Sequence, residues 1–174
     1  MYIQVGKPAP EFALQALVGD KFENIALSDY RGKKWVVLFF YPLDFTFVCP
    51  TEILEFSKHA EDFAKLNGVI LGGSIDSIYS HLAWTKELGQ LNYPLLSDIT
   101  QEVARNYGIL IEEKGHALRG LFIIDPEGIL RYQVVHDLSV GRSVQETLRV
   151  LEALQSGELC PVGWKKGEKT LGKA

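Results

Sequence analysis

The residues of this chain best suited to covalent chemistry are its two cysteines, Cys49 and Cys160. Cys49 follows an uncharged run of β-branched and aromatic residues at 35–41, which predicts a strand buried on both faces. Pro42 ends that strand, and Pro50 suits the first turn of a helix because its missing N–H would have no partner there. Cys49 is therefore expected at a helix N-terminus, where unpaired N–H groups favour an anion. The thiolate is the nucleophilic form of cysteine.

The alternative interpretation of Cys49 is a free thiol that packs as a small hydrophobic side chain, which is a common fate of cysteine. A strand end, a loop bounded by two prolines and an abrupt helix start are costly surroundings for a residue that only packs. The local pattern therefore favours a reactive cysteine.

The elements that must position this cysteine follow from the hydrophobic pattern. Apolar residues recur at helical spacing over 51–66, and a second buried strand is predicted at 69–75. With the strand at 35–41 they form a βαβ unit, whose strands should be parallel and joined by a right-handed crossover. The segments 12–17 and 22–27 flank a Gly-Asp turn and predict an N-terminal hairpin.

The second half of the chain predicts a ββα unit. Strands at 120–124 and 129–135 flank a turn that contains proline and glycine. A capping box formed by Ser143 and Glu146 predicts the start of the last helix, and Gly157 predicts its end.

A βαβ unit followed by a ββα unit is the thioredoxin-like α/β fold. Here it carries the N-terminal hairpin and a central insertion near 77–111, in which short helices are predicted at 81–88 and 101–107. We expect one domain over residues 1–164, and a polar, solvated and mobile tail over 165–174.

Composition limits the function. A chain of 174 residues with 47% hydrophobic content can build one substantial core. A net charge of −4 argues against nucleic acid as the main partner. The first residues show no secretory signal, and no apolar run approaches the ~20 residues of a membrane helix. Two cysteines without an export signal indicate a reducing cytoplasm, where a disulfide is usually transient.

Neither a metal nor a cofactor is expected. The four histidines have no metal-ligand spacing with one another or with the cysteines. The pair Gly72-Gly73 lacks both a phosphate-loop and a dinucleotide-binding pattern, so it is interpreted as a point of close backbone packing.

The segment FYPLDFTFVCPTE contains the pattern Pro42-x-x-x-Thr46-x-x-Cys49. This pattern resembles the active-site signature of the peroxiredoxins, the thiol peroxidases. Further blocks resemble the typical two-cysteine class (the alkyl hydroperoxide reductase/thiol-specific antioxidant family) and occur in the order of that class. These blocks are HLAW at 81–84, RGLFIID at 119–125, DLSVGRSV at 137–144 and CPVGW at 160–164. The resemblance extends over the chain as far as Trp164.

The resemblance implies that Cys49 attacks the O–O bond of a peroxide and becomes a sulfenic acid. It also implies that Cys160 resolves this acid from the facing subunit of an antiparallel dimer, so that the Cys49–Cys160 disulfide joins two chains. From the residues alone, Cys160 could equally be a structural disulfide partner or an inert thiol.

An ordinary thiol is about 3% ionised at neutral pH, so complete ionisation accelerates attack at most roughly 30-fold. Most of the catalysis must therefore come from donors placed at the peroxide oxygens. The resemblance assigns that role to Arg119, assigns orientation of the peroxide to Thr46, and assigns covering of the sulfur to Pro42. Without it, these residues would suit a surface ion pair, a helix cap and a strand end. The resemblance also implies that Glu52 and Arg142 hold the site together, although the two residues could instead form a surface ion pair. Trp84, in the HLAW block, is expected to pack near the site.

The class implies a thioredoxin-like protein or a flavoprotein disulfide reductase as electron donor, and a homodimer that assembles into a ring such as a decamer. Two other functions stay open at this point. A general disulfide oxidoreductase would need a Cys-x-x-Cys pair, which is missing around Cys49. A non-enzymatic holdase ring would not need the cysteine at all.

Two features of oxidation-sensitive members of the class are not found in this sequence. Those members have a GGLG segment and a C-terminal helix with a Tyr-Phe pair. This chain reads TKELGQLNY at 85–93 and continues for ten residues after Trp164. We therefore expect the site to open readily when its disulfide forms.

Overall fold

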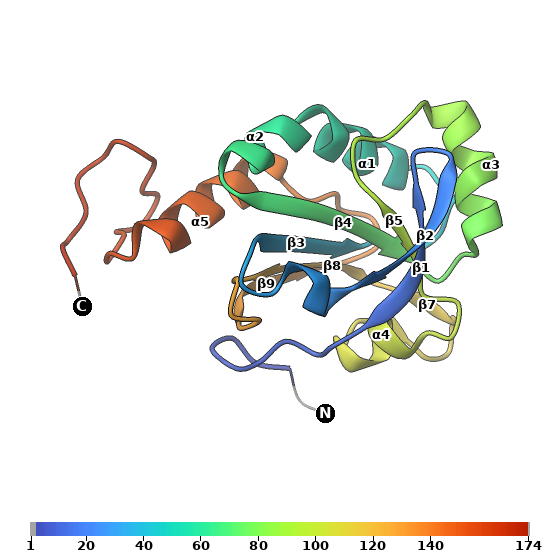
Figure 1. Cartoon of the computed structure of the whole chain (residues 1–174), viewed down its shortest axis with the longest axis horizontal. Coiled ribbons are helices and arrows are strands. Elements are labelled where there is room, and N and C mark those ends of the chain that lie inside the picture. Colours follow the sequence, from blue (N-terminus) through green and yellow to red (C-terminus); the bar gives the residue numbers. More distant parts are fainter. Residues whose placement is uncertain (1–2, 174) are drawn as a thin grey trace.

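Seven strands form one mixed sheet in the computed structural model, which describes residues 3–173. Their order in space is β2-β1-β5-β4-β3-β8-β9 (Figure 1). Neighbours β3, β4 and β5 are parallel, and all other neighbouring pairs are antiparallel. The strands are β1 Ala13–Val18, β2 Lys21–Ala26, β3 Trp35–Phe40, β4 Gly68–Ser74, β5 Leu95–Ser97, β8 Arg119–Ile124 and β9 Leu130–His136.

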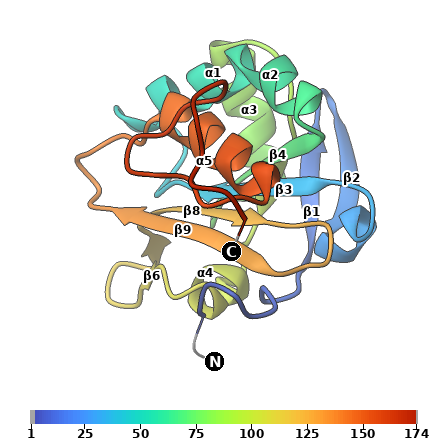
Figure 2. The ribbon, with the colours of Figure 1, turned by 90° about the vertical axis from the view of Figure 1, so that its left-hand side faces the viewer.

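Helices cover both faces of this sheet (Figure 2). One face is covered by α1 Cys49–Lys58, α2 Ala60–Lys65, α3 Ile78–Leu88 and α5 Val144–Ser156. The other face is covered by the 3₁₀ helix η1 Leu27–Tyr30, by α4 Glu102–Asn106 and by the N-terminal segment. A separate two-stranded ladder joins β6 Leu110–Ile111 to β7 His116–Ala117.

The central strand β3 shows why the sheet is buried on both faces. Along residues 36–41, even-numbered side chains join one hydrophobic core and odd-numbered side chains join the other, all at 1% exposure or less. Side chains of a strand alternate between faces, so a run that is apolar at every position requires cover on both sides. The strand predicted from this run and its parallel pairing with β4 are confirmed.

The predicted helix over 51–66 is correct in place but wrong in detail. It begins two residues earlier, at Cys49, and it is interrupted at His59, whose backbone is not helical. The imidazole of His59 contacts the carboxylates of Glu55 and Asp62 on either side of the interruption. No glycine or proline marks this position, so the hydrophobic pattern could not reveal the break.

The predicted hairpin at residues 120–135 is confirmed as β8–β9, and Gly128 has the positive φ of +83° that its turn requires. The last helix is also confirmed, with Gly157 in the left-handed conformation at its end. Only half of the predicted capping box forms. The Ser143 hydroxyl accepts from the backbone N–H of Glu146, but the carboxylate of Glu146 binds Arg149 instead.

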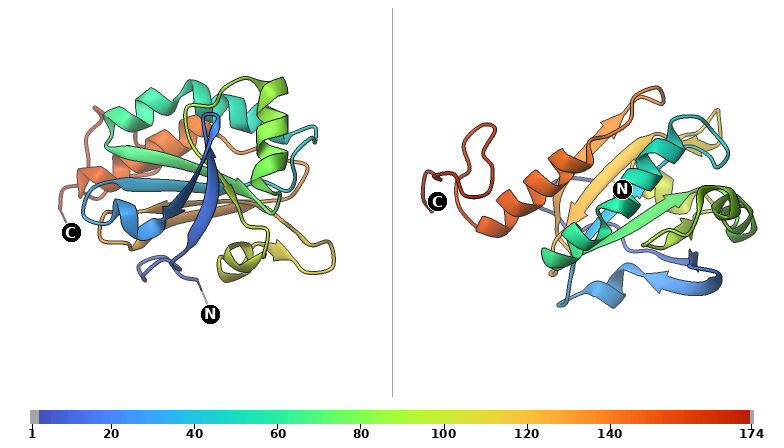
Figure 3. Two further views of the ribbon diagram at one scale, coloured as in Figure 1. Left: turned by 45° about the vertical axis from the view of Figure 1, so that its right-hand side comes forward. Right: turned by 90° about the horizontal axis from the view of Figure 1, so that it is seen from above.

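The segment after α5 extends beyond the body of the molecule (Figures 1 and 3). Residues 165–173 are mostly exposed, as expected of a polar tail, but they fold back on the segment before Cys160. The N–H of Leu159 donates to Gly172 O, and the N–H of Leu171 donates to Leu159 O, both at 2.8 Å. The tail is therefore tied to the segment that carries the second cysteine.

Candidate active site

Cys49 is the first residue of α1, and its side chain is completely buried against the core of that helix face. No side chain caps the backbone N–H groups at this helix end. Pro50 occupies the first turn, as predicted. The sulfur thus lies at the positive end of the helix dipole, where a negative charge is favoured.

Thr46 directs its hydroxyl at this sulfur. Its Oγ1 lies 2.9 Å from Cys49 Sγ and 2.9 Å from Leu43 O. A hydroxyl has a single proton, so it donates to one of these atoms at a time, and a thiolate is the stronger acceptor. Thr46 does not cap α1, which removes the alternative role considered for it.

Arg119 reaches the sulfur from β8, the strand that pairs with β3. It is the first residue of β8 and is only 3% exposed, so it is not a surface residue. Its Nη1 lies 3.3 Å from Cys49 Sγ and 2.8 Å from Glu52 Oε2, and its Nε donates to Leu138 O at 2.8 Å. Two fixed acceptors therefore hold the guanidinium plane against the sulfur.

Glu52 and Arg142 form the support behind this contact. The Glu52 carboxylate accepts from Nε, Nη2 and the backbone N–H of Arg142 at 2.7–2.9 Å, in addition to its bond with Arg119. Arg142 Nη1 also donates to Phe40 O in β3 and to Gly120 O in β8. This buried group of Glu52, Arg119 and Arg142 is named here the Glu52 cluster. It joins α1, the strands β3 and β8 and the segment that leads into α5.

The cluster carries an unbalanced charge next to the sulfur. Burial raises the pKa of Glu52, but the hydrogen bonds and charge of Arg142, together with the charge of Arg119, outweigh burial and hold this pKa below its ordinary value. Two buried guanidiniums then face one carboxylate, which leaves one excess positive charge. A thiolate at Cys49 supplies the missing negative charge, and unpaired buried charge is costly.

The Glu52 cluster leads to a prediction about stability and pH. Because the folded-state pKa of Glu52 is lowered, its contribution is complete above the unfolded value of ~4.3 and is lost as pH falls through the folded value. Glu52→Gln should reduce the free energy of unfolding by about 3–5 kcal/mol at pH 7, because it leaves two buried cations unpaired. Urea unfolding between pH 7 and 3 should show this difference shrinking toward the acid end.

Glu146→Gln is the matched control, because Glu146 pairs with Arg149 on the surface of α5. Its effect should stay at about 1 kcal/mol or less at every pH. Equal effects of the two substitutions at pH 7 would show that the Glu52 cluster does not hold the site together.

Trp84 and Pro42 lie near the site without a polar contact to the sulfur. Trp84 in α3 is 2% exposed, and its ring centroid lies 5.8 Å from those of Tyr41 and Phe45. It packs beneath the segment that carries Thr46. Pro42 is buried directly after β3. The role of Pro42 in covering the sulfur stays a prediction.

Cys160 is not brought to Cys49 within the chain. Both cysteines are free, and Cys160 Sγ lies 3.4 Å from Ser156 Oγ at the far end of α5. The 13 residues of α5 span about 20 Å, and the helix begins next to the Glu52 cluster. Cα atoms joined by a disulfide lie within about 7 Å of each other. The two cysteines of one chain are therefore far beyond bonding distance.

Sequence reasoning missed groups that the fold brings to the site from elsewhere. The carbonyl groups of Leu138, Phe40 and Gly120 orient the two arginines, and backbone acceptors leave no trace in residue types. Asp44 and His81 are bonded to each other beneath the Thr46 segment. In the sequence, His81 begins the HLAW block and has no metal-ligand spacing to other residues, and neither feature indicates a pairing with Asp44.

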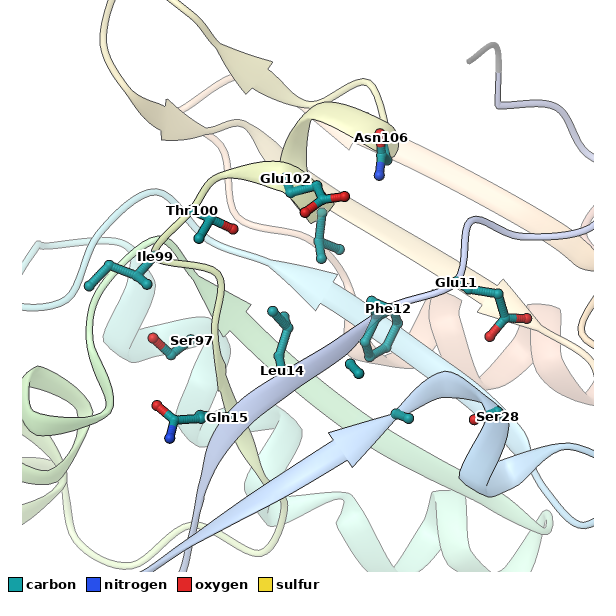
Figure 4. Close-up of a pocket in the computed structure, with 13 residues that line it drawn as sticks. Glu11, Phe12, Leu14, Gln15, Ser28, Ser97, Ile99, Thr100, Glu102 and Asn106 are labelled. Carbon is teal, nitrogen blue, oxygen red and sulfur yellow. The ribbon is translucent and has the colours of Figure 1, made fainter.

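A cavity of about 680 Å³ lies elsewhere, among β1, η1 and the segment that leads into α4 (Figure 4). The apolar part of the cavity lining includes Phe12, Leu14 and Val103, and its polar part includes Glu11 and Glu102. It contains none of the site residues described above. Buried polar side-chain atoms in residues 3–173 all have hydrogen-bond partners, so no buried polar side chain of this cavity lacks one.

Within residues 3–173, no cluster of three or more His, Cys, Asp or Glu side chains could hold a metal ion. The same part of the chain has no helix long and apolar enough to cross a membrane.

Comparison with known proteins gives the family. The family model described as "AhpC/TSA family" matches residues 5–133. The Clostridium pasteurianum protein named "Putative peroxiredoxin in rubredoxin operon" is 58% identical over 175 residues, covering 96% of this chain and 98% of that protein. The chain belongs to the AhpC/TSA family, the peroxiredoxins.

Relatives named as 2-Cys peroxiredoxins agree with this chain in sequence and in structure. The chloroplastic 2-Cys peroxiredoxin BAS1 of Hordeum vulgare is 54% identical, over 96% of this chain and 84% of that protein. The reduced 2-Cys peroxiredoxin of Plasmodium vivax superposes with a TM-score of 0.93 at 42% identity, covering 95% of this chain and 91% of that one. The thioredoxin-like fold is thereby confirmed, and the chain is a thiol-dependent peroxidase.

Proposed function

We propose that this peroxiredoxin reduces hydrogen peroxide and organic hydroperoxides through Cys49, and that Cys160 of the partner subunit resolves the oxidised cysteine. The observation that carries the proposal is the pair of donors at one buried sulfur. Thr46 Oγ1 lies 2.9 Å and Arg119 Nη1 lies 3.3 Å from Cys49 Sγ.

The proposed cycle has three balanced steps. The Cys49 thiolate attacks one peroxide oxygen, an S–O bond forms as the O–O bond breaks, and the leaving oxygen takes a proton to become water or an alcohol. The thiol of the partner's Cys160 then attacks the sulfenic sulfur, which forms a disulfide and releases water. A donor supplies two electrons and two protons to restore both thiols.

The site geometry suits the first of these steps. As the O–O bond breaks, negative charge leaves the sulfur and collects on the departing oxygen. Arg119 offers several donors in one plane and keeps its charge, so it can follow that charge from sulfur to oxygen. The excess positive charge of the Glu52 cluster acts in a buried site, where electrostatic stabilisation is stronger than in water.

Resolution by a second chain is supported by the position of Cys160. Its thiol lies about one helix length from Cys49 of the same chain, in a segment that projects from the molecule (Figure 3). A projecting segment can reach a neighbour without unfolding the domain that carries it. We therefore propose a homodimer with two Cys49–Cys160 disulfides between its chains.

Higher assembly and the electron donor are further parts of the proposal. We propose that dimers form a ring such as a decamer. A Plasmodium yoelii relative with 42% identity is described as an artifactual octamer when modified at its N-terminus.

A thioredoxin-like protein or a flavoprotein reductase is proposed as the electron donor. Free cysteines suit a reducing compartment such as the cytoplasm, although the Hordeum vulgare relative is chloroplastic.

Cys160→Ser should keep one stoichiometric turnover of peroxide and lose donor-dependent cycling, because its sulfenic acid has no resolving thiol. Non-reducing electrophoresis after one equivalent of peroxide should show a disulfide-linked dimer for the wild type and only monomer for the variant. Peroxide consumption coupled to NAD(P)H oxidation, measured with each donor class, would identify the reductant.

A mixture of Cys49→Ser and Cys160→Ser chains provides the control. Only a mixed dimer contains both cysteines on facing chains, so the mixture should regain one linked band after exchange of subunits. A wild-type chain that is fully oxidised and still migrates as a monomer would rule out the disulfide between subunits.

A further inference from the structure

A buried polar cluster lies beneath residues 42–48, named here the active-site loop. The Asp44 carboxylate accepts from the Tyr41 hydroxyl at Oδ1 and from Ser80 Oγ and His81 Nδ1 at Oδ2, each at 2.8 Å. The side chains of Asp44 and His81 are 1% and 0% exposed. The peroxidase chemistry described above uses none of these groups.

His81 connects this cluster to the sheet. Its Nε2 lies 3.0 Å from Leu96 O in β5, while its Nδ1 faces Asp44. Both ring nitrogens therefore lie within hydrogen-bond distance of an oxygen atom. These contacts of His81 join α3, β5 and the active-site loop in a region without water access, where hydrogen bonds are strong.

Asp44, which forms one half of the Asp44–His81 pair, lies close to the catalytic residues along the chain. Asp44 is two residues before Thr46 and five before Cys49. Its backbone N–H donates to Asp76 Oδ2 at 2.9 Å, so the residue is held by main chain and side chain alike. The next residue, Phe45, has a φ of +57°, a conformation that non-glycine residues adopt only when their surroundings enforce it.

We propose that the Asp44–His81 pair is a latch that holds the active-site loop closed, making His81 and Asp44 positioning residues for Thr46 and Cys49. The latch would set how often the loop opens to present oxidised Cys49 to the partner's Cys160. Its part in resolution rests on the proposed function, whereas its part in the peroxide step does not.

The two chemical steps need opposite states of the loop. Attack on peroxide needs the closed loop, in which Thr46 and Arg119 contact the sulfur. Disulfide formation needs an open loop, because Cys49 is completely buried. When the closed state dominates, a tenfold weaker latch raises the open population about tenfold and hardly lowers the closed one. A weakened latch should therefore speed resolution and leave the peroxide step slightly slower.

His81→Gln and His81→Asn form an informative pair. A glutamine amide takes the place of Nε2, so it keeps the bond to Leu96 and loses the bond to Asp44. An asparagine amide takes the place of Nδ1 and keeps Asp44. After mixing with hydrogen peroxide, rapid-quench mass spectrometry of trapped sulfenic acid and disulfide gives the rate of each step. His81→Gln should raise the resolution rate about tenfold with less than a threefold loss in the peroxide step, and His81→Asn should stay nearer the wild type.

Two milder variants and one control keep the test decisive. Tyr41→Phe and Ser80→Ala each remove one donor to Asp44 and should shift both rates in the same directions by smaller factors. Asp98→Asn replaces a different buried carboxylate, which accepts from two backbone N–H groups of α4. It should lower thermal stability without changing the resolution rate and the peroxide rate in opposite directions. The proposal would be wrong if the peroxide rate and the resolution rate fell together in every variant of the latch, or if neither rate changed. A wild-type chain whose Cys49 is never oxidised would instead overturn the proposed function.

Discussion

Cys49→Ser is expected to reduce peroxide consumption to the rate seen without protein. A serine hydroxyl is not ionised at neutral pH, and its oxygen cannot accept the peroxide oxygen as sulfur does. The substitution should leave the fold intact, because an oxygen at this position can still accept from Thr46 and Arg119. The measurement is peroxide loss in a donor-coupled assay, with thermal unfolding to confirm the fold.

Cys160→Ser is the natural comparison, since it changes the same atom in the other cysteine. It should still consume one equivalent of peroxide, whereas the Cys49 variant should consume none. Steady consumption by the Cys49 variant would mean that another group is the nucleophile, and the assignment of the site would be wrong.

Arg119→Lys should be the second largest loss, about 10²–10³-fold in the rate of Cys49 oxidation. Lysine keeps the charge but gathers its donors on one atom, so it cannot hold Leu138 O, Glu52 and the sulfur together in one plane. Stopped-flow oxidation by hydrogen peroxide would measure this step. Reduction of the preformed disulfide by a donor should change little, because the peroxide is no longer present.

Arg131→Lys provides the matched control, because Arg131 pairs with Asp125 at the opposite end of the β8–β9 hairpin. It should leave Cys49 oxidation unchanged. If Arg119→Lys also oxidises at the wild-type rate, then Arg119 supports the structure and does not act on the peroxide.

The sequence predicted the parts of the fold that depend on local pattern. The apolar run at 35–41 requires a strand buried on both faces, and Gly157 ends the last helix in a conformation that suits glycine. It did not predict β5, which has only three residues and pairs with strands distant in sequence. The fold-back of residues 165–173 also depends on backbone bonds that have no signature in residue types.

The site was predictable to a different degree. The position of Cys49 followed from local pattern, whereas the roles of Arg119, Glu52 and Arg142 came only from the resemblance to a family. From its residue type alone, Arg119 would suit a surface ion pair. The structure buries it because β8 lies next to β3, whose end leads to the cysteine. That adjacency is a property of the sheet order, which no single segment encodes.

The Glu52 cluster also bears on the reduction potential of the proposed disulfide. Unwinding the first turn of α1 would draw Glu52 away from two buried guanidiniums, a cost borne by the oxidised protein and recovered when the thiols return. A disulfide whose reduced form is favoured accepts electrons more readily, by about 30 mV for every 1.4 kcal/mol. The contacts that favour a thiolate at Cys49 would therefore also make the proposed disulfide a stronger oxidant of the protein that reduces it.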